Sequence, residues 1–513
     1  MPTRNVDKRR LATLGGLFVA AVVYAFVMVH PIETASVGRD AAAPVIHFER
    51  ILGGRHIEAY LGITPKPLIT AVNGLLYTAT GDWRPVAWAE IGAFALCVVL
   101  GAVVAGRIGG NASAAFVAVA LLLSPTLLDE IAFVHAVPWA LLAWLVAAMA
   151  VTDQRPRYGI AGIALMLGAL ARLETLLVVG LAAGVLVIAE ILHRTRGRPR
   201  PPRSAWLVMS GFLALPVMLI HDWLLTGDPL FWAKVAQANS DVAGTAQGPI
   251  WVTLWLGRHL VEMAPLLPFA ALGVVVIVRR RAWPLALGLV ALGPGVGGFL
   301  IYLAARGTFF STRYAAPIDL SLVFVAGLGL AAVDAPLVRA WLGRFVPRGG
   351  RAAIAGLAVG AIAGLAFAPI GVLDRDARAN VAREVQLLAN EQRAVAAIRP
   401  RLGSIPSWRN AGPAIVGTPP RILVPARVRE QVAVDLDLSL NTVFRTQAKS
   451  IDLAKGRLVP GQIVYHDRLD DSSDPRYKAL EIETATTFGT VRLTPLLADR
   501  ARGIWVILVE AAN

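Results

Sequence analysis

The chain has 513 residues, of which 56% are hydrophobic and only 16% are charged. One water-soluble core cannot bury that much apolar surface, so a soluble protein is excluded and most apolar residues must face lipid or membrane helices. The formal net charge of +15 falls mainly in short loops between apolar segments, not on one soluble face, so nucleic acid is not an expected partner.

Eleven apolar segments follow one another along the first 372 residues. Several approach the length of about 20 residues that an α-helix needs to cross the hydrocarbon core of a membrane. The expected fold class is therefore mainly α, a polytopic bundle of about 11 transmembrane helices. The segments are 11–29, 86–106, 112–128, 134–151, 159–171, 175–192, 204–222, 261–278, 284–304, 315–334 and 352–372.

Basic residues distinguish the two sides of the membrane. Lys8, Arg9 and Arg10 precede the first segment, which is predicted to be a signal anchor. Loops rich in Arg, such as RTRGRPRPPR (194–203), alternate with loops that contain few basic residues. Because Lys and Arg accumulate in cytoplasmic loops, the N-terminus is predicted to be cytoplasmic. The long loops 30–85 and 223–260 and the tail from 373 are then expected outside.

The tail differs in composition from the rest of the chain. DARANVAREVQLLANEQRAVAAIRP (376–400) has the spacing of an amphipathic helix, and short apolar runs that follow it are typical of buried strands. The predicted division is a transmembrane catalytic module over 1–372 and a small soluble α/β domain over 373–513 on the outer face. The apolar runs are AIVG (414–417), GQIVY (461–465) and GIWVILVEA (503–511).

The first outer loop carries the best catalytic candidate. GRDAAAPVIHFERILGG (38–54) places Asp40 at the start of a stretch whose apolar residues have helical spacing, which predicts a helix lying on the membrane surface. TPKPLITAVNGLLYTATGDW (64–83) predicts a second interfacial helix and contains Lys66. A carboxylate held there can accept a proton from a hydroxyl group, although an aspartate in a loop is also often merely solvated.

Arginines at the outer surface run against the usual distribution of basic residues. LARLETLL (170–177) places Arg172 and Glu174 between two apolar segments, and ARGTFFSTRYAAP (305–317) contains Arg306 and Arg313. A guanidinium group offers paired donors that match a phosphate group. The alternative is an ion pair between Arg172 and Glu174, with contacts to lipid headgroups for the other two.

Further acidic residues lie in the other outer loops. SPTLLDEIAFVH (124–135) contains Asp129 and Glu130, which could face Asp40 across a cleft and share a divalent cation, or simply solvate a loop. Asp228 lies in TGDPLF (226–231), which is first of all a turn signal.

The order of these elements resembles the GT-C integral-membrane glycosyltransferases, especially the bacterial branch akin to protein O-mannosyltransferases and the lipid A aminoarabinose transferase. Three positions depart from the family pattern: Ala41 replaces a frequent second acid, Leu68 a second proline after Lys66, and Leu173 a proline before Glu174. The matching stretches are GRDAAAPVIHFERIL, PKPLITAVNGLLY, LARLETLL, GDPLFWAKVA and TRYAAP.

The resemblance implies a reaction and roles for these residues. The donor would be a polyprenyl-phosphate sugar, and the acceptor a hydroxyl group on a lipid, a glycan or a protein, with inversion at the anomeric carbon. Asp40 would act as general base, and no cofactor is required, although a divalent cation held by Asp40, Asp129 and Glu130 is possible. Donor phosphate binding falls to Arg313, Arg172, Arg306 and Lys66, with Glu174, Asp129, Glu130 and Asp228 as supporting polar groups.

Two other functions compete with this hypothesis. A transporter or flippase of lipid-linked saccharides predicts ionisable residues in the middle of helices or paired inverted repeats, whereas nearly all charges here lie at segment ends and no convincing repeat is found. A catalytically inactive GT-C homologue is the other alternative, since Ala41 removes one expected acid. All three functions imply a multi-pass protein of the plasma membrane that contacts membrane lipids.

Overall fold

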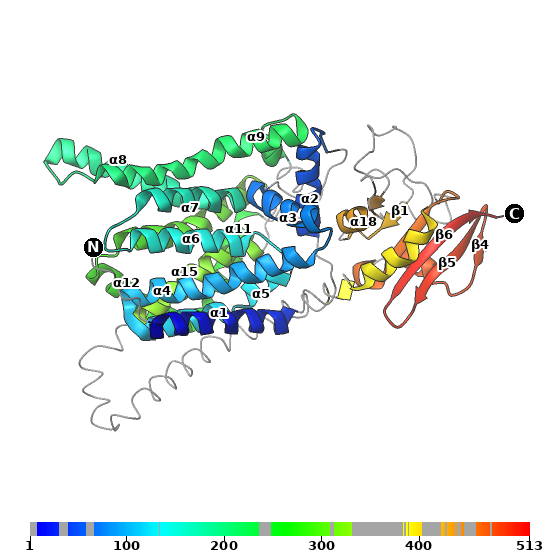
Figure 1. Cartoon of the computed structure of the whole chain (residues 1–513), viewed down its shortest axis with the longest axis horizontal. Coiled ribbons are helices and arrows are strands. Elements are labelled where there is room, and N and C mark those ends of the chain that lie inside the picture. Colours follow the sequence, from blue (N-terminus) through cyan, green and yellow to red (C-terminus); the bar gives the residue numbers. More distant parts are fainter. Residues whose placement is uncertain are drawn as a thin grey trace, which may run out of the picture.

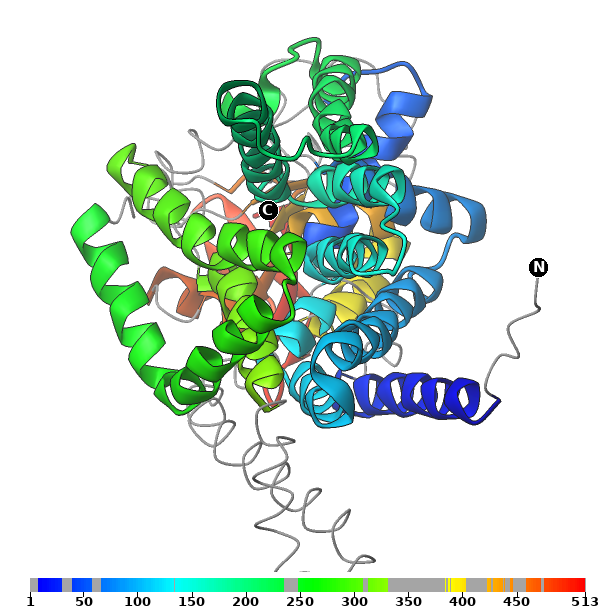
Figure 2. The same ribbon diagram turned by 90° about the vertical axis from the view of Figure 1, so that its left-hand side faces the viewer.

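The computed structural model shows a helix bundle with a sheet-containing domain at one end (Figure 1). Figure 2 looks at the opposite end of the bundle. The structure describes residues 8–29, 39–57, 66–132, 134–234, 248–307, 312–330, 383, 386–387, 389–402, 422–425, 428–436, 438, 443–445, 458–471 and 475–512.

The helices of the bundle coincide with the predicted apolar segments, and they make the chain a multi-pass membrane protein. Among the described residues, five helical stretches are long and apolar enough to cross a membrane, and four shorter apolar helices pack between them. The last predicted segment, 352–372, lies outside the described residues. The helices are α1 (Lys8–Val29), α4 (Arg84–Leu122), α5 (Pro125–Ala132), α6 (Val137–Val151), α7 (Tyr158–Ala171), α8 (Thr175–Arg196), η1 (Arg203–Leu213), α9 (Ala214–Thr226), α11 (Pro249–Glu262), η2 (Ala264–Leu266), α12 (Leu267–Arg279), α13 (Trp283–Val290), η3 (Ala291–Gly295), α14 (Val296–Ala305), η4 (Thr312–Ala315) and α15 (Ala316–Gly329).

The predicted segment 86–106 lies in the first arm of α4, and the segment 112–128 begins in its second arm. The chain reverses at Gly110, which has a φ of 82° that favours glycine. A Cβ atom on Gly106 would lie 3.1 Å from the Ala114 Cβ, and one on Gly101 would lie 2.5 Å from a Leu121 methyl group. Because residues equally distant from the turn face each other, the arms are antiparallel and closely packed.

The basic loops gather at one end of the bundle. Arg107, beside the turn of α4, donates a hydrogen bond from Nη1 to the Met149 carbonyl oxygen at 3.1 Å, close to the end of α6. Figure 1 places the ends of α8 and α12 there too, far from the C-terminal domain. Both of those helices end in basic residues.

Two short helices lie at the other end of the bundle, where the sequence predicts interfacial helices. They are α2 (Arg39–Leu52) and α3 (Pro67–Thr80), with Pro67 in the first turn of α3 and Gly81 ending it at a φ of 67°. The two helices cross closely because Gly74 leaves room for the Phe48 ring.

The C-terminal domain contains a six-stranded mixed sheet in the order β2-β1-β3-β6-β5-β4. Strand β1 runs parallel to β2 and β3, and the other pairs are antiparallel. GQIVY and GIWVILVEA lie in β3 and β6 as predicted, whereas AIVG lies outside the described residues. The elements are β1 (Ile422–Val424), α18 (Arg429–Asp435), β2 (Val443–Arg445), β3 (Ile463–Asp467), α19 (Arg468–Asp471), η9 (Pro475–Leu480), β4 (Thr486–Phe488), β5 (Val491–Asp499) and β6 (Ile504–Ala511), preceded by helical residues 389–398 and η6 (Arg399–Arg401).

One hydrophobic core joins this domain to α2 and α3. Val45 and Ile46 of α2 are buried in the same cluster as Val432 of α18 and Val424 of β1. The face of α2 that bears these residues is therefore covered by the C-terminal domain, because α18 contacts α2 directly.

Substitution Gly74→Ala tests the crossing of α2 and α3. The added Cβ would lie 2.2 Å from the Phe48 Cβ and Cγ atoms, so overpacking should lower the free energy of unfolding by about 1–3 kcal/mol. Thermal unfolding in detergent measures the change. Gly92→Ala on α4 is the control, because nothing lies within 4 Å of its added Cβ and alanine should match or exceed the stability of the parent protein. Equal stability of the two variants would contradict this packing.

Candidate functional site

Arg172 and Glu174 occupy the tight turn between α7 and α8. Arg172 Nη2 donates to Glu174 Oε1 at 2.6 Å and its Nε to Oε2 at 3.4 Å, so the ion pair considered from the sequence forms. Both side chains are nearly buried, at 8% and 13% exposed. Burial acts to raise the pKa of Glu174, but the charge and hydrogen bonds of Arg172 outweigh it and the pKa is lowered. Glu174 is therefore a carboxylate.

Two further groups border this pair. The guanidinium carbon of Arg172 lies 5.6 Å from the centre of the Tyr314 ring, which belongs to η4. Lys66, the residue before α3, contributes its charge to lowering the pKa of Glu174. Residues from three parts of the sequence therefore meet at this turn: Lys66 before α3, the Arg172–Glu174 pair, and Tyr314 of η4, which belongs to the TRYAAP stretch.

Glu90 is a buried acid that the sequence analysis missed. It lies in the second turn of α4, is fully buried, and accepts a hydrogen bond from Trp139 Nε1 at 2.9 Å. Lys66 and Glu130 both act on it electrostatically. An acidic residue inside an apolar segment was the available signal, because such residues are costly in a membrane and usually functional.

Glu130 is part of the same buried region. It is 1% exposed, and its Oε1 lies 3.3 Å from His135 Nδ1. The idea that this acid only solvates a loop is therefore wrong. Asp129, its neighbour on α5, has a side chain outside the described part of the structure.

A second polar cluster connects α2 to α9; Asp222 was a polar candidate from the sequence, whereas His47 and His221 were not predicted. The His47 ring of α2 meets the His221 ring of α9 edge to face, with centres 6.4 Å apart. His221 Nδ1 lies 3.2 Å from Asp222 Oδ1, and the backbone N–H of Trp232 donates to Asp222 Oδ2 at 2.7 Å. Asp222 is fully buried, so this carboxylate fixes the His221 ring.

The remaining candidates lie apart from the buried residues or have no described side chain. The half-buried Asp228 follows the end of α9 and accepts a hydrogen bond from Lys234. This hydrogen bond is the main reason that the pKa of Asp228 is lowered, as expected for a surface turn. Arg306 is exposed where α14 ends. The backbones of Asp40 and Arg313 lie in the first turn of α2 and in η4, and their side chains lie outside the described part.

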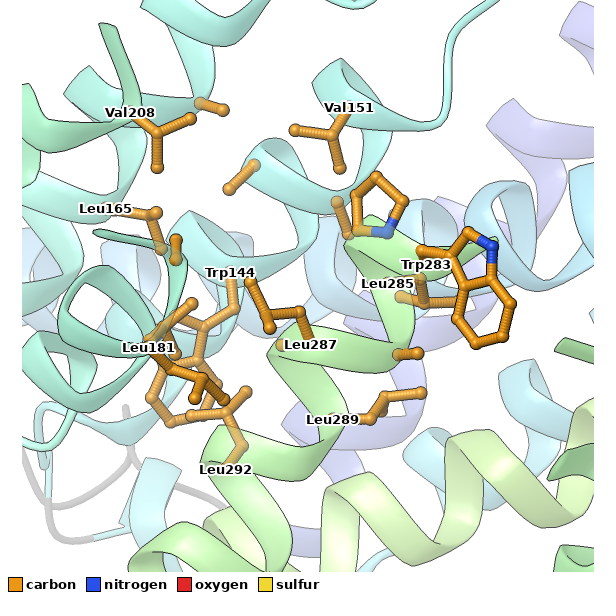
Figure 3. A pocket seen from close by; sticks show the side chains of 18 of the residues that line it. Trp144, Val151, Leu165, Leu181, Val208, Trp283, Leu285, Leu287, Leu289 and Leu292 are labelled. Atoms are coloured by element: carbon orange, nitrogen blue, oxygen red, sulfur yellow. The ribbon is translucent and has the colours of Figure 1, made fainter. Parts of the chain in front are cut away.

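An apolar cavity of about 710 Å³ lies within the bundle between α6, α7, α8, η1, α13, η3 and α15. Figure 3 shows Trp144, Leu165, Leu181 and Val208 around it. Trp144 Nε1 donates to Thr175 Oγ1 at 2.9 Å, and Thr175 directly follows Glu174. The Trp144 side chain, which lines the cavity, therefore links it to the turn that holds the Arg172–Glu174 pair.

Metal binding has no complete ligand set among the described side chains, which include no group of three or more His, Cys, Asp or Glu residues placed to hold an ion. Of the predicted ligands Asp40, Asp129 and Glu130, only Glu130 has a described side chain.

Comparison with known proteins identifies the fold. No protein-family model matches the sequence, and no relative is found among curated proteins. The apo oligosaccharyltransferase of Archaeoglobus fulgidus superposes with a TM-score of 0.51 at 13% identity, over 88% of this chain and 69% of that one. The AglB enzyme of the same organism, bound to an inhibitory peptide and a dolichol-phosphate, gives 0.50 at 12% identity over 92% and 71%. ArnT from Cupriavidus metallidurans gives 0.48 at 16% identity over 97% and 98%.

The chain therefore shares its fold with the archaeal oligosaccharyltransferase, a mainly helical bundle of the class that the sequence predicts.

The stability of the α2–α9 contact should depend on pH. Burial, followed by the charge of His221, lowers the pKa of His47 from 6.5 to about 3. Between these values the unfolded chain binds more protons than the folded protein, so stability is complete above pH 6.5 and is lost as the pH falls toward 3.

Thermal unfolding measured across this pH range tests the assignment. His47→Phe keeps a ring against His221 and removes the titrating group, so its unfolding temperature should fall less steeply with acid. His193→Gln, at the far end of α8, should follow the parent protein. Identical slopes for all three proteins would contradict the burial of a neutral His47.

Proposed function

We propose that the protein transfers a sugar from a polyprenyl-phosphate donor to an acceptor hydroxyl group at the outer face of the plasma membrane. The observation that carries the proposal is the nearly buried Arg172–Glu174 pair, with the half-buried Lys66 close enough to act on it, at the end of a bundle that shares its fold with the archaeal oligosaccharyltransferase. A structure of the archaeal AglB contains a dolichol-phosphate, so the fold accommodates a lipid phosphate in that protein. Burial of charged side chains costs free energy, and a protein that served only as a membrane scaffold would have no need of it.

The distribution of charge supports the orientation. Basic loops lie at the end of the bundle opposite the C-terminal domain, and such loops remain in the cytoplasm. The N-terminus is then cytoplasmic, while α2, α3 and the C-terminal domain face the outside. Donor and acceptor would therefore meet at the outer surface.

The reaction is a single displacement. Asp40, in the first turn of α2, would take the proton from the acceptor hydroxyl as that oxygen attacks the anomeric carbon. The bond between the anomeric carbon and the phosphate oxygen breaks, polyprenyl phosphate leaves with the electron pair, and the anomeric centre inverts.

Cationic side chains would stabilise the departing phosphate. Arg313 lies next to Tyr314, whose ring centre is 5.6 Å from the Arg172 guanidinium carbon, so η4 lies close to the α7–α8 turn. We assign donor phosphate binding to Arg313, Arg172 and Lys66, with Arg306 at the exposed rim. Each donor placed against the leaving group is worth a few kcal/mol in the transition state.

We assign supporting roles to the acidic residues other than Asp40. Glu174 holds the Arg172 guanidinium group, whose carbon lies over the Tyr314 ring at 5.6 Å from its centre. Glu130 and Asp129 would line the site beside Glu90, and a divalent cation shared with Asp40 remains the hypothesis for these acids. The oligosaccharyltransferase of Archaeoglobus fulgidus has been solved with zinc and sulfate, which supports testing a metal here. Asp228 would act only by forming its surface turn.

The lipid part of the donor needs an apolar surface next to the phosphate site. The cavity beside Trp144 offers one, because Thr175 connects it to the Arg172–Glu174 turn. Burial of hydrocarbon there is favourable in the same way as burial in the bilayer.

Replacement of Asp40 tests the assigned base. Purified protein in detergent is offered a panel of polyprenyl-phosphate sugars with acceptor extract, and release of polyprenyl phosphate is measured. Asp40→Asn should lower turnover by about 100-fold or more, because an amide cannot accept the proton. Asp153→Asn, in an ion pair at the basic end, should leave turnover unchanged. Near-normal turnover of Asp40→Asn would exclude Asp40 as base, and no turnover of any donor by the parent protein would favour a transporter or an inactive homologue.

Replacement of Arg313 tests phosphate binding. Arg313→Ala should raise the donor KM about tenfold or more, because a charge-assisted hydrogen bond to phosphate is lost, while the acceptor KM stays the same. Arg306→Ala should have a smaller effect, since that side chain is exposed. Equal losses for donor and acceptor would indicate a structural role for Arg313.

A further inference from the structure

The helix that carries Asp40 is covered by the C-terminal domain. Ala42 and Ala43, one turn or less from Asp40, are completely buried in the core that contains Val432 of α18 and Leu436, the residue that follows α18. Helix α18 contacts α2 directly, and Ala42 lies two residues after Asp40. A shift of α18 would therefore displace α2, which carries Asp40.

A directional hydrogen bond fixes α18 on the bundle. Trp83, the residue before α4, donates from Nε1 to Asp435 Oδ1 at 3.0 Å. The Trp83 ring is 4% exposed and packs on the Tyr77 ring of α3, with ring centres 4.2 Å apart. Hydrophobic contacts alone have no direction, whereas this bond sets the distance and rotation of α18.

Asp435 is itself held on several sides. Its Oδ2 accepts a hydrogen bond from Gln431 Nε2 at 2.8 Å, and its carbonyl oxygen accepts one from Arg399 Nη2 at 2.6 Å. Burial raises the pKa of Asp435, which its hydrogen bonds to Gln431, Trp83 and Glu391 only partly offset. A half-buried carboxyl group at a domain contact loses part of its hydration, and the hydrogen bonds from Trp83 and Gln431 compensate for that loss.

We propose that α18 sets the position of the Asp40 helix through the Trp83–Asp435 hydrogen bond, so that Trp83 and Asp435 are positioning residues for sugar transfer. This rests on the proposed function, with Asp40 as base. The C-terminal domain is then a working part of the active site: its docking places the carboxylate against the acceptor hydroxyl. Displacement of a catalytic group by about 1 Å can cost a factor of about 100 in rate.

Two substitutions at Asp435 distinguish a role in positioning the Asp40 helix from a role in folding. Asp435→Leu removes the acceptor for Trp83, whereas Asp435→Asn keeps an oxygen that can accept the same hydrogen bond. Per folded molecule, Asp435→Leu should lower kcat by about 10- to 100-fold with the donor KM little changed, and Asp435→Asn should restore most of kcat. Trp83→Phe should match Asp435→Leu, and combining the two should add little, because both remove one bond. Glu483→Gln, which removes an exposed ion pair elsewhere in the domain, should leave kcat unchanged.

Hydrogen exchange measures the docking without any turnover. In Asp435→Leu, amides of residues 39–52 should exchange faster, while those of α12 at the opposite end stay protected. Unchanged exchange over 39–52, or a kcat per folded molecule equal to that of the parent, would overturn the proposal. If the parent protein shows no turnover that depends on Asp40, the proposed function is overturned instead. Faster exchange of residues 39–52 in Asp435→Leu would then still show that α18 holds α2 in place.

Discussion

The burial of charge at one end of a membrane bundle is the constraint on which the rest of the structure depends. Arg172 and Glu174 neutralise each other in a turn that is almost closed to solvent, while Glu90 and Glu130 are fully enclosed. An isolated buried charge costs several kcal/mol, so each of these groups requires its neighbours to be in place. Helices far apart in sequence are thereby held at fixed positions where donor and acceptor would meet.

Helix α2 depends on the same end of the bundle for its own position. One side meets α3 through the space left by Gly74, one meets α9 through His47 and His221, and one is covered by α18. A short interfacial helix has little stability alone, because most helical stability in proteins comes from packing. Three different contacts therefore make α2 a rigid support, which a catalytic carboxylate needs in order to act.

The sequence alone determined the apolar helices of the bundle, the short helices α2 and α3, and contacts between residues close along the chain. Apolar length predicts membrane helices, and a 3.6-residue period predicts α2, because both depend only on local patterns. The Arg172–Glu174 pair was also accessible, since the two residues are separated by one position in a turn. Strands β3 and β6 followed from short apolar runs bounded by glycine. These features are set by residues that are close along the chain.

Only the tertiary structure decided which polar residues share a site. Glu90 receives its hydrogen bond from Trp139, 49 residues away, and Trp83 reaches Asp435 across 352 residues. Asp228, in contrast, had the residue type of a site but bonds to nearby Lys234 at the surface. Spacing along the chain cannot separate these cases, because the cost of a charge depends on its burial and partners. Both are fixed when the helices pack and α18 closes over α2.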